Sequence, residues 1–206
     1  MMTNTPIVKS FCSPPIDRRE IYRYMKCGGQ SAEIDALIDE AIKACDGRLR
    51  YDTVSIALAI SSMDNGDIRL GGIELQSRDL EKALTGCDSV VIFAATVGLE
   101  IDRLIAKYGR LQPSLALCIQ ALGAERIEAL CDQFCDDLRS QGLNIRPRFS
   151  AGYGDLPLDF QRSIFSLLDC HKSIGLTLNE SLLMSPTKSV SAIIGIKKTD
   201  QNNEIT

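Results

Sequence analysis

A run of apolar residues from Ser89 to Ala95 places the strongest constraint on how this chain can fold. The run reads SVVIFAA and carries no charge, which is typical of a β-strand that is buried on both of its faces. The segment Thr96–Gly98 then leads directly into a predicted helix from Leu99 to about Tyr108. We therefore expect a strand with no solvent-facing side, followed closely by a helix.

Five further segments carry apolar residues at helical spacing, and most begin with a capping residue and end near a glycine. With their caps, these segments are Asp17–Met25, Ser31–Gly47, Ser77–Thr85, Pro113–Leu138 and Asp159–Lys172. The segment 113–138 is the longest of the predicted helices.

Strand-like patterns occupy much of the remaining sequence. Alternating apolar residues at 48–60 are followed by the turn signal DNG at 64–66, which predicts a hairpin into 68–73. The C-terminal third is predicted to contain a loop at 143–158 and two strands, 176–183 and 189–196.

These elements predict an α+β fold in which helices pack on a curved, largely antiparallel sheet. The sequence shows no internal repeat and no long linker, so residues 1–206 are expected to form a single domain. Residues 1–15 and 197–206 are expected to be flexible ends.

Composition excludes several classes of function. Hydrophobic content of 45% and charged content of 24% are typical of a globular protein, and the net charge of −4 argues against a nucleic-acid partner. No apolar stretch is long enough to span a membrane, so no membrane partner is expected. Residues 1–15 lack the pattern of a signal peptide, which favours a cytoplasmic location.

The chain has eight cysteines and one histidine, and neither set forms a standard metal motif. Most of the cysteines fall in predicted helices and strands, where we expect them to act as small core residues. Cys131 and Cys135 are four residues apart on one helix face, so a metal or redox role for this pair stays open as the weakest alternative. His171 is expected near the end of a helix in contact with solvent, which does not favour general-base catalysis. Sequence motifs for nucleotide binding, metalloproteases and serine hydrolases are missing.

The segment 148–161 carries the residues that best suit a ligand. An arginine, Arg148, precedes a turn of small residues, and Tyr153 and an acidic residue follow. A guanidinium pairs well with a carboxylate, and an aromatic ring can cover a flat group, so a small anionic ligand fits this pattern. Glu128 of the long predicted helix is a candidate partner for a ligand amine. The alternatives are that 148–161 is simply a turn and that Glu128 is a surface residue.

Four motifs in the C-terminal third resemble a known family. In order, they are RFSAGY at 148–153, IGLTLNES at 174–181, MSP at 184–186 and SVS at 189–191. Together they resemble the activation domain of cobalamin-dependent methionine synthase, with the same order and spacing over roughly fifty residues. The chain is similar to a free-standing version of this domain, without the cobalamin, homocysteine and folate modules of the full enzyme.

The resemblance implies a site for S-adenosylmethionine. Arg148 would hold the carboxylate of this ligand, and Glu128 would contact the same molecule. Other residues implied in the site are Ser150, Ala151, Gly152 and Tyr153. The resemblance also implies a face that docks on a corrinoid partner, made by the loop at 150–156 together with Met184, Pro186, Ser189 and Ser191.

The function implied by the resemblance is reactivation of cobalamin in a corrinoid-dependent methyltransferase, most simply methionine synthase. In the family, cobalamin that has been oxidised to the cob(II) state receives one electron from a flavodoxin-type donor and a methyl group from S-adenosylmethionine. No catalytic residue of the chain itself is implied. The chain would act as an accessory protein that works only together with its cobalamin-carrying partner.

A second reading from the sequence is a docking or S-adenosylmethionine-sensing module that has lost methyl donation. Ala151 stands where the family often has proline, and Gly154-Asp155 replaces a more apolar continuation. A Tyr-rich strand that follows the SVS element in the family also has no counterpart in the sequence. The Ala151 substitution and the missing strand favour the second reading.

Overall fold

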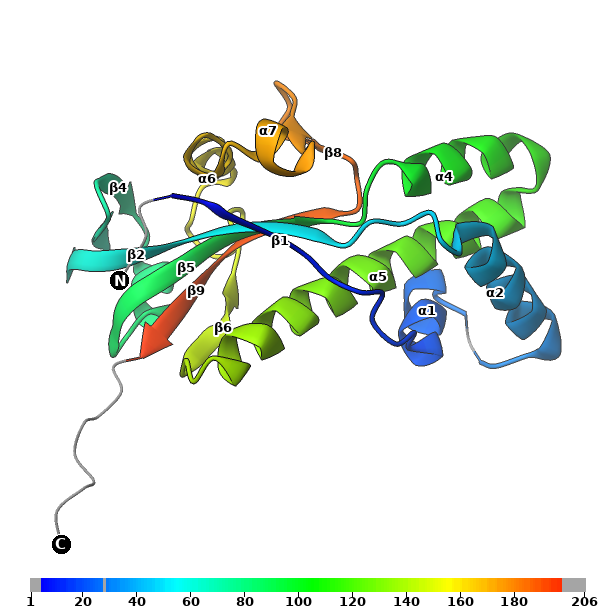
Figure 1. Ribbon diagram of the computed structural model, residues 1–206, viewed down its shortest axis with the longest axis horizontal. Helices are drawn as coiled ribbons and strands as arrows, with labels where there is room; N and C mark the ends of the chain where they lie inside the picture. The colour runs from blue at the N-terminus through cyan, green and yellow to red at the C-terminus, as the bar shows by residue number, and fades with distance from the viewer. Residues whose placement is uncertain (1–4, 28, 198–206) are drawn as a thin grey trace, which may run out of the picture.

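The computed structural model describes residues 5–27 and 29–197 and shows one large antiparallel sheet with helices on both faces (Figure 1). The strands are β1 (Ile7–Ser10), β2 (Asp52–Asp64), β3 (Asp67–Leu70), β4 (Ile73–Gln76), β5 (Cys87–Thr96), β6 (Ile145–Phe149) and β9 (Ser189–Lys197). Their order is β4-β3-β2-β5-β9-β6, and β1 pairs with β2. A separate short pair is formed by β7 (Thr177–Leu178) and β8 (Met184–Ser185).

Helices lie on both faces of this sheet. They are α1 (Arg18–Met25), α2 (Ala32–Cys45), α3 (Arg78–Ala83), α4 (Glu100–Leu111), α5 (Pro113–Ser140), α6 (Gln161–Leu168) and α7 (Cys170–Ile174), with a 3-10 turn η1 (Leu158–Phe160) ahead of α6. The long helix α5 crosses one face, and α6 and α7 lie against the other (Figure 1). Helices α1, α2 and α4 pack on the part of α5 that extends beyond the sheet (Figure 1). The predicted class, α+β with helices on a largely antiparallel sheet, is confirmed.

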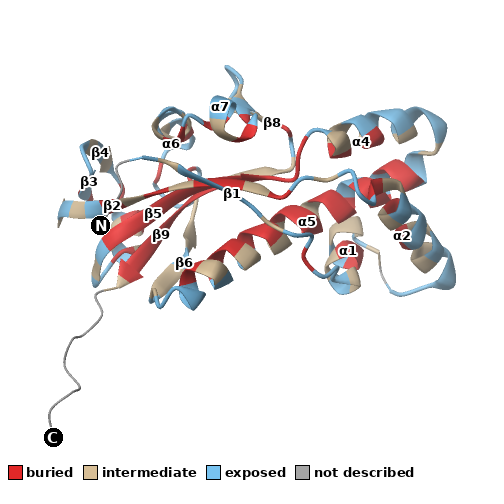
Figure 2. Ribbon diagram, viewed as in Figure 1, coloured by how far each residue is buried: buried red, intermediate tan, exposed pale blue. Residues whose placement is uncertain are grey.

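Strand β5 is buried on both faces, as its apolar sequence predicts. Val91 and Phe93 pack in the core beneath α5, whereas Val90 and Ile92 pack in the core beneath α6 and α7. The ring of Phe93 stacks on Phe134 of α5 with 4.6 Å between the ring centroids. Figure 2 shows the resulting band of buried residues along β5, β9 and the inner side of α5.

Strand β6 was not predicted, because 143–158 was expected to be a loop throughout. Residues Ile145–Phe149 instead form the outer strand beside β9. The sequence IRPRF does not show the pattern of a strand, because Pro147 is a poor strand residue and two arginines interrupt the apolar residues. An edge position accommodates the proline, and the register between Ile145 and Arg148 is irregular at this point.

Two C-terminal predictions were wrong in their extent. The expected strand 176–183 is reduced to Thr177–Leu178, because the chain turns at Asn179 and returns as β8. The expected helix 159–172 is interrupted at Asp169, whose left-handed conformation separates α6 from α7.

The N-terminal segment also differs from expectation. Residues 1–15 were expected to be flexible, but Ile7–Ser10 form β1 and pair with the first residues of β2. Their sequence is too short and too exposed to give a periodic signal. The expectations for residues 1–4 and 198–206, and for Gly28 as part of a helix stop, lie outside the described residues.

A buried ion pair fastens the N-terminal segment to α5. Glu125 and Arg126 are 3% and 2% exposed, and their side chains pair with each other. The Arg126 guanidinium also donates to the carbonyl oxygens of Pro14 at 2.6 Å and Pro15 at 2.8 Å, and a Glu125 carboxylate oxygen accepts the backbone N–H of Asp17 at 3.0 Å. The pair therefore satisfies backbone groups of the segment that leads into α1.

A second polar anchor fixes the loop that follows β6. The Asp155 carboxylate accepts from the Ser77 hydroxyl and from the backbone N–H groups of Arg78 and Asp79 at the start of α3. Gly154 has a φ of +54°, and a Cβ on it would lie 2.5 Å from an Asp79 oxygen, so a larger residue would be strained there. These contacts tie residues 150–156 to the body of the protein.

Replacing Arg126 with alanine is expected to lower the free energy of unfolding by about 3–5 kcal/mol, because Glu125 would stay buried without its partner. Urea denaturation followed by circular dichroism measures this quantity. Arg139→Ala on the same helix removes only the exposed pair with Asp136 and should change the value by less than about 0.5 kcal/mol. Equal losses in the two variants would contradict the assigned role of Arg126.

The contribution of Asp155 is expected to depend on pH. Hydrogen bonding, first from Ser77 and then from the backbone of α3, lowers the pKa of Asp155 despite partial desolvation. The carboxylate therefore adds stability above its unfolded pKa of about 3.9, and this contribution is lost as the pH falls through the folded pKa.

The measurement is the stability difference between the wild type and Asp155→Asn, followed from pH 7 downward. The difference should be largest at neutral pH and should vanish in acid. Asp159→Asn, which removes an exposed contact to Arg162, serves as the matched control. A difference that is constant with pH would rule out the charge-dependent anchor.

Candidate functional site

The cleft at the β6 edge of the sheet brings together most of the residues that the sequence singled out. It encloses about 450 Å³, which is within the usual range for small-molecule sites. Five predicted ligand residues line it: Glu128, Arg148, Ser150, Ala151 and Tyr153. Three residues of the predicted partner face line the same cleft: Met184, Ser189 and Ser191.

Two of the predicted site residues do not line the cleft. Gly152 is exposed, has a φ of +88° and donates its N–H to the carbonyl of Leu156 at 2.9 Å, so it shapes the turn. Pro186 is buried. Ser191 is only 2% exposed, so Pro186 and Ser191 present little surface of their own, and the partner face stays a prediction. Ser191 is buried because β9 runs inside the sheet, between β5 and β6, whereas Pro186 lies between β8 and β9.

Arg148 projects from β6 toward helix α5. Its Nη2 donates to Glu128 Oε2 at 3.1 Å and to Asp132 Oδ1 at 2.9 Å. Its Nη1 is buried and has no hydrogen-bond partner among the described residues. A buried guanidinium nitrogen without a partner is costly, so Arg148 is a candidate to bind an anionic group.

The charge of this site is well defined. Burial acts to lower the pKa of the Arg148 guanidinium, but the neighbouring Cys131, Glu128 and Asp132 act to raise it, and the net pKa is raised. Arg148 therefore stays cationic, and it combines an Nη2 that is paired with carboxylates and an Nη1 without a partner among the described residues. A ligand that carries both an anionic and a cationic group would match this arrangement.

Gln161 is a lining residue that the sequence analysis missed as a site residue. It is the first residue of α6 and is 8% exposed, and its Oε1 is buried without a partner among the described residues. The Ser191 hydroxyl oxygen is also buried without a hydrogen-bond partner among the described residues. Gln161 is the last residue of the segment 148–161, which the sequence suggested as a ligand site. A single glutamine at the start of a helix does not by itself indicate a binding residue.

The loop from Ser150 to Leu156 forms the outer wall of the cleft. Ala151 is 5% exposed and packs into the core beneath α6, whereas Tyr153 is 68% exposed at the rim. The backbone N–H of Tyr153 donates to the carbonyl of Ser150, and that of Leu156 donates to the carbonyl of Tyr153. The loop is thus a compact turn that presents one aromatic side chain beside the opening.

The cysteine pair of α5 is part of the core. Cys131 and Cys135 are buried, and burial raises the pKa of the Cys131 thiol to about 12. No group of three or more potential metal ligands occurs in residues 5–27 and 29–197. His171 is exposed on α7, as predicted. No helix in the described part of the chain has the length and apolar character needed to cross a membrane.

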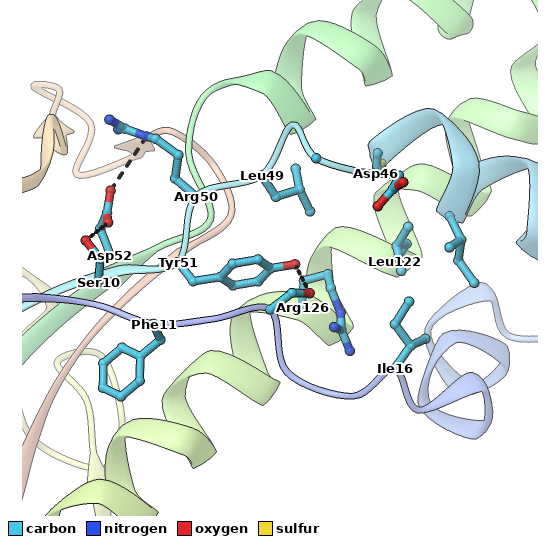
Figure 3. A pocket seen from close by; sticks show the side chains of 14 residues that line it. Ser10, Phe11, Ile16, Asp46, Leu49, Arg50, Tyr51, Asp52, Leu122 and Arg126 are labelled. Atoms are coloured by element: carbon cyan, nitrogen blue, oxygen red, sulfur yellow. Dashed lines mark hydrogen bonds and ion pairs between the residues drawn. The ribbon is translucent and has the colours of Figure 1, made fainter.

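A second cavity of about 480 Å³ lies between the N-terminal segment, α2 and α5 (Figure 3). Several of its polar side chains have partners: the Ser10 hydroxyl donates to Asp52, the Ser13 hydroxyl donates to Tyr51, and Arg126 is held as described above. None of the buried side-chain polar atoms that lack a partner in the described residues belongs to this cavity. The cleft beside β6 is therefore the better candidate for a ligand site.

The fold has a known counterpart among solved structures. The crystal structure of the MetH reactivation domain bound to AdoHcy superposes with a TM-score of 0.71 and 16% sequence identity. The match covers 96% of this chain and 80% of that one. At this identity the likeness establishes the fold. No curated protein sequence matches the chain.

The sequence itself also matches a family model, which describes the activation domain of vitamin B12-dependent methionine synthase. The match spans residues 80–203 and includes β5, α5, β6, the loop at 150–156 and β9. It therefore contains every residue that the sequence analysis assigned to the site. The chain belongs to the family of vitamin B12-dependent methionine synthase activation domains.

Proposed function

We propose that this chain binds S-adenosylmethionine in the cleft beside β6 and supports the reductive remethylation of a corrinoid carried by a methionine synthase or a related methyltransferase. The observation that carries the proposal is that three of the residues that line this one cleft each carry a buried polar atom without a partner in the described residues: Arg148 Nη1, Gln161 Oε1 and Ser191 Oγ. Membership of the activation-domain family and the AdoHcy ligand of the similar structure support the same type of ligand.

The charges at the α5 side of the cleft suit the amino-acid end of the ligand. Arg148 Nη1 provides a donor for the carboxylate, and Glu128, which is about half exposed, provides an acceptor for the ammonium group. Pairing of a carboxylate with a guanidinium is strong because both groups are charged. The small residues Ser150 and Ala151 let the ligand approach the backbone closely.

The chemistry asks little of the protein beyond binding and orientation. The sulfonium of S-adenosylmethionine is already a good leaving group, so no general acid or base of this chain is required. The corrinoid of the partner supplies the cobalt that accepts the methyl group, and a flavodoxin-type donor supplies one electron. The residues of this chain hold the ligand at the sheet edge and leave its methyl group accessible at the opening, beside Tyr153.

A second candidate is a docking or sensing module that binds the same ligand without donating its methyl group. The observation that favours it is the strong exposure of Tyr153 at 68%, which leaves the cleft open at its outer rim. Both candidates predict ligand binding, and only the first predicts methyl transfer.

Arg148→Ala is expected to weaken S-adenosylmethionine binding by roughly 10- to 100-fold, because one charge-assisted hydrogen bond is lost. Isothermal titration calorimetry of the purified protein measures this change. Arg146→Ala is the matched control, since Arg146 is on the same strand but does not line the cleft and donates to the carbonyl of Thr85. Absence of binding in the wild type, or an equal loss in both variants, would remove the ligand assignment.

Methyl transfer distinguishes the two candidates. A corrinoid protein loaded with cob(II)alamin, an electron donor and S-adenosylmethionine should regain methylcobalamin faster when this chain is present, as followed by absorbance. Arg148→Ala should reduce the acceleration at limiting S-adenosylmethionine. Tight ligand binding with no acceleration would instead favour the docking or sensing module.

A further inference from the structure

The cleft has a second polar end that the expected ligand residues do not explain. Gln161 and Ser191 both line the cleft, and their exposed fractions are only 8% and 2%. Gln161 Oε1 and Ser191 Oγ lack hydrogen-bond partners within the described residues. Neutral polar atoms that are buried in this way are normally satisfied, so two of them on residues that line one cleft indicate a missing partner.

Strand register separates this end from Arg148. Arg148 pairs with Ile194, whose side chain packs in the core beneath α5. Ile193 packs in the core beneath α6, and Ser191 is two residues away, so it shares that face of the sheet. Gln161 begins α6 and approaches from the same side. The cleft therefore passes around the sheet edge, with a charged end toward α5 and a neutral end toward α6.

The two ends differ in the chemistry that they recognise. The charged end presents a guanidinium and a carboxylate, which match a zwitterionic group. The neutral end presents a carboxamide and a hydroxyl, each of which can both donate and accept. A glutamine amide pairs well with the edge of an adenine base, and a serine hydroxyl pairs with a base or sugar hydroxyl. Uncharged groups of this kind are what the nucleoside half of the ligand offers.

We propose that Gln161 and Ser191 bind the nucleoside half of the ligand and are specificity-determining residues of this cleft. This inference rests on the proposed function, because it assumes a ligand with an amino-acid half and a nucleoside half. It adds an orientation: the amino-acid half lies on the α5 side, and the nucleoside lies on the α6 side. The bend between the two halves then falls at the sheet edge, near the opening of the cleft.

The test compares a whole ligand with its nucleoside half. S-adenosylhomocysteine and 5′-methylthioadenosine are titrated by calorimetry into the wild type, Gln161→Met, Ser191→Ala and Arg148→Ala. Gln161→Met and Ser191→Ala should each weaken both ligands by roughly 3- to 10-fold, the effect of one neutral hydrogen bond. Arg148→Ala should weaken S-adenosylhomocysteine and leave 5′-methylthioadenosine unchanged.

Arg162→Ala is the matched control for Gln161. Arg162 is the next residue, is half exposed and pairs with Asp159. The Arg162→Ala variant should therefore bind both ligands as tightly as the wild type does. Thermal melting of each variant checks that it folds. Ser191→Ala removes a single oxygen from the same end, so it tests the proposal even if Gln161→Met fails to fold.

The outcomes separate this inference from the proposed function. If the wild type binds S-adenosylhomocysteine but Gln161→Met and Ser191→Ala bind it equally well, only the inference is overturned. It is also overturned if these variants lose S-adenosylhomocysteine but not 5′-methylthioadenosine, or if the wild type does not bind 5′-methylthioadenosine. If the wild type binds neither ligand, both the proposed function and this inference are overturned.

Discussion

Complete burial of strand β5 is the constraint on which the rest of the structure depends. Because β5 has apolar side chains on both faces, the sheet needs a layer of helices on each side, and α5 and α6 with α7 provide them. The stacking of Phe93 on Phe134 fixes α5 across one face. That placement brings Glu128 and Asp132 of α5 within hydrogen-bond distance of Arg148 on β6.

The order of the strands then locates the cleft. Strand β9 separates β5 from β6, so the outer edge of the sheet is formed by the short strand β6 and the loop that follows it. The chain leaves the edge after Phe149 and reaches the other face, where Gln161 begins α6. Three of the five buried side-chain polar atoms that lack a partner in the described residues belong to residues that line this cleft, whereas none belongs to a residue of the cavity in Figure 3. Unsatisfied groups raise the free energy of the unliganded state, and a ligand that pairs with them gains that energy back.

Elements with a strong apolar pattern were predictable from the sequence, and so was the gathering of the C-terminal motifs. The run at 89–95, the long helix at 113–138 and the turn at Asn65 all appear as expected, because each is decided by local periodicity or turn chemistry. The motifs that begin at Arg148 and Ser189 meet in one cleft. Strand β6 escaped prediction because its pairing with β9 compensates for a proline and two charges that look unlike a strand.

Other features depend on contacts between distant parts of the chain. The pairing of Glu125 and Arg126 with backbone groups near Pro14 and Asp17 leaves no periodic trace in the sequence. The roles of Gln161 and Ser191 likewise follow only from their burial without partners. Asp155 is a further example. In the sequence it appears only as a departure from the family pattern, but its carboxylate accepts hydrogen bonds at the start of α3, which is distant in the chain.

The central claim is that one cleft at the sheet edge holds both halves of an S-adenosylmethionine-type ligand. A crystal structure of this chain with S-adenosylhomocysteine tests it most directly. The account predicts ligand density beside β6, with the carboxylate at Arg148 Nη1 and the nucleoside near Gln161 and Ser191. Density in the cavity beside Tyr51, or a ligand that leaves Arg148 Nη1 without a partner, would contradict it.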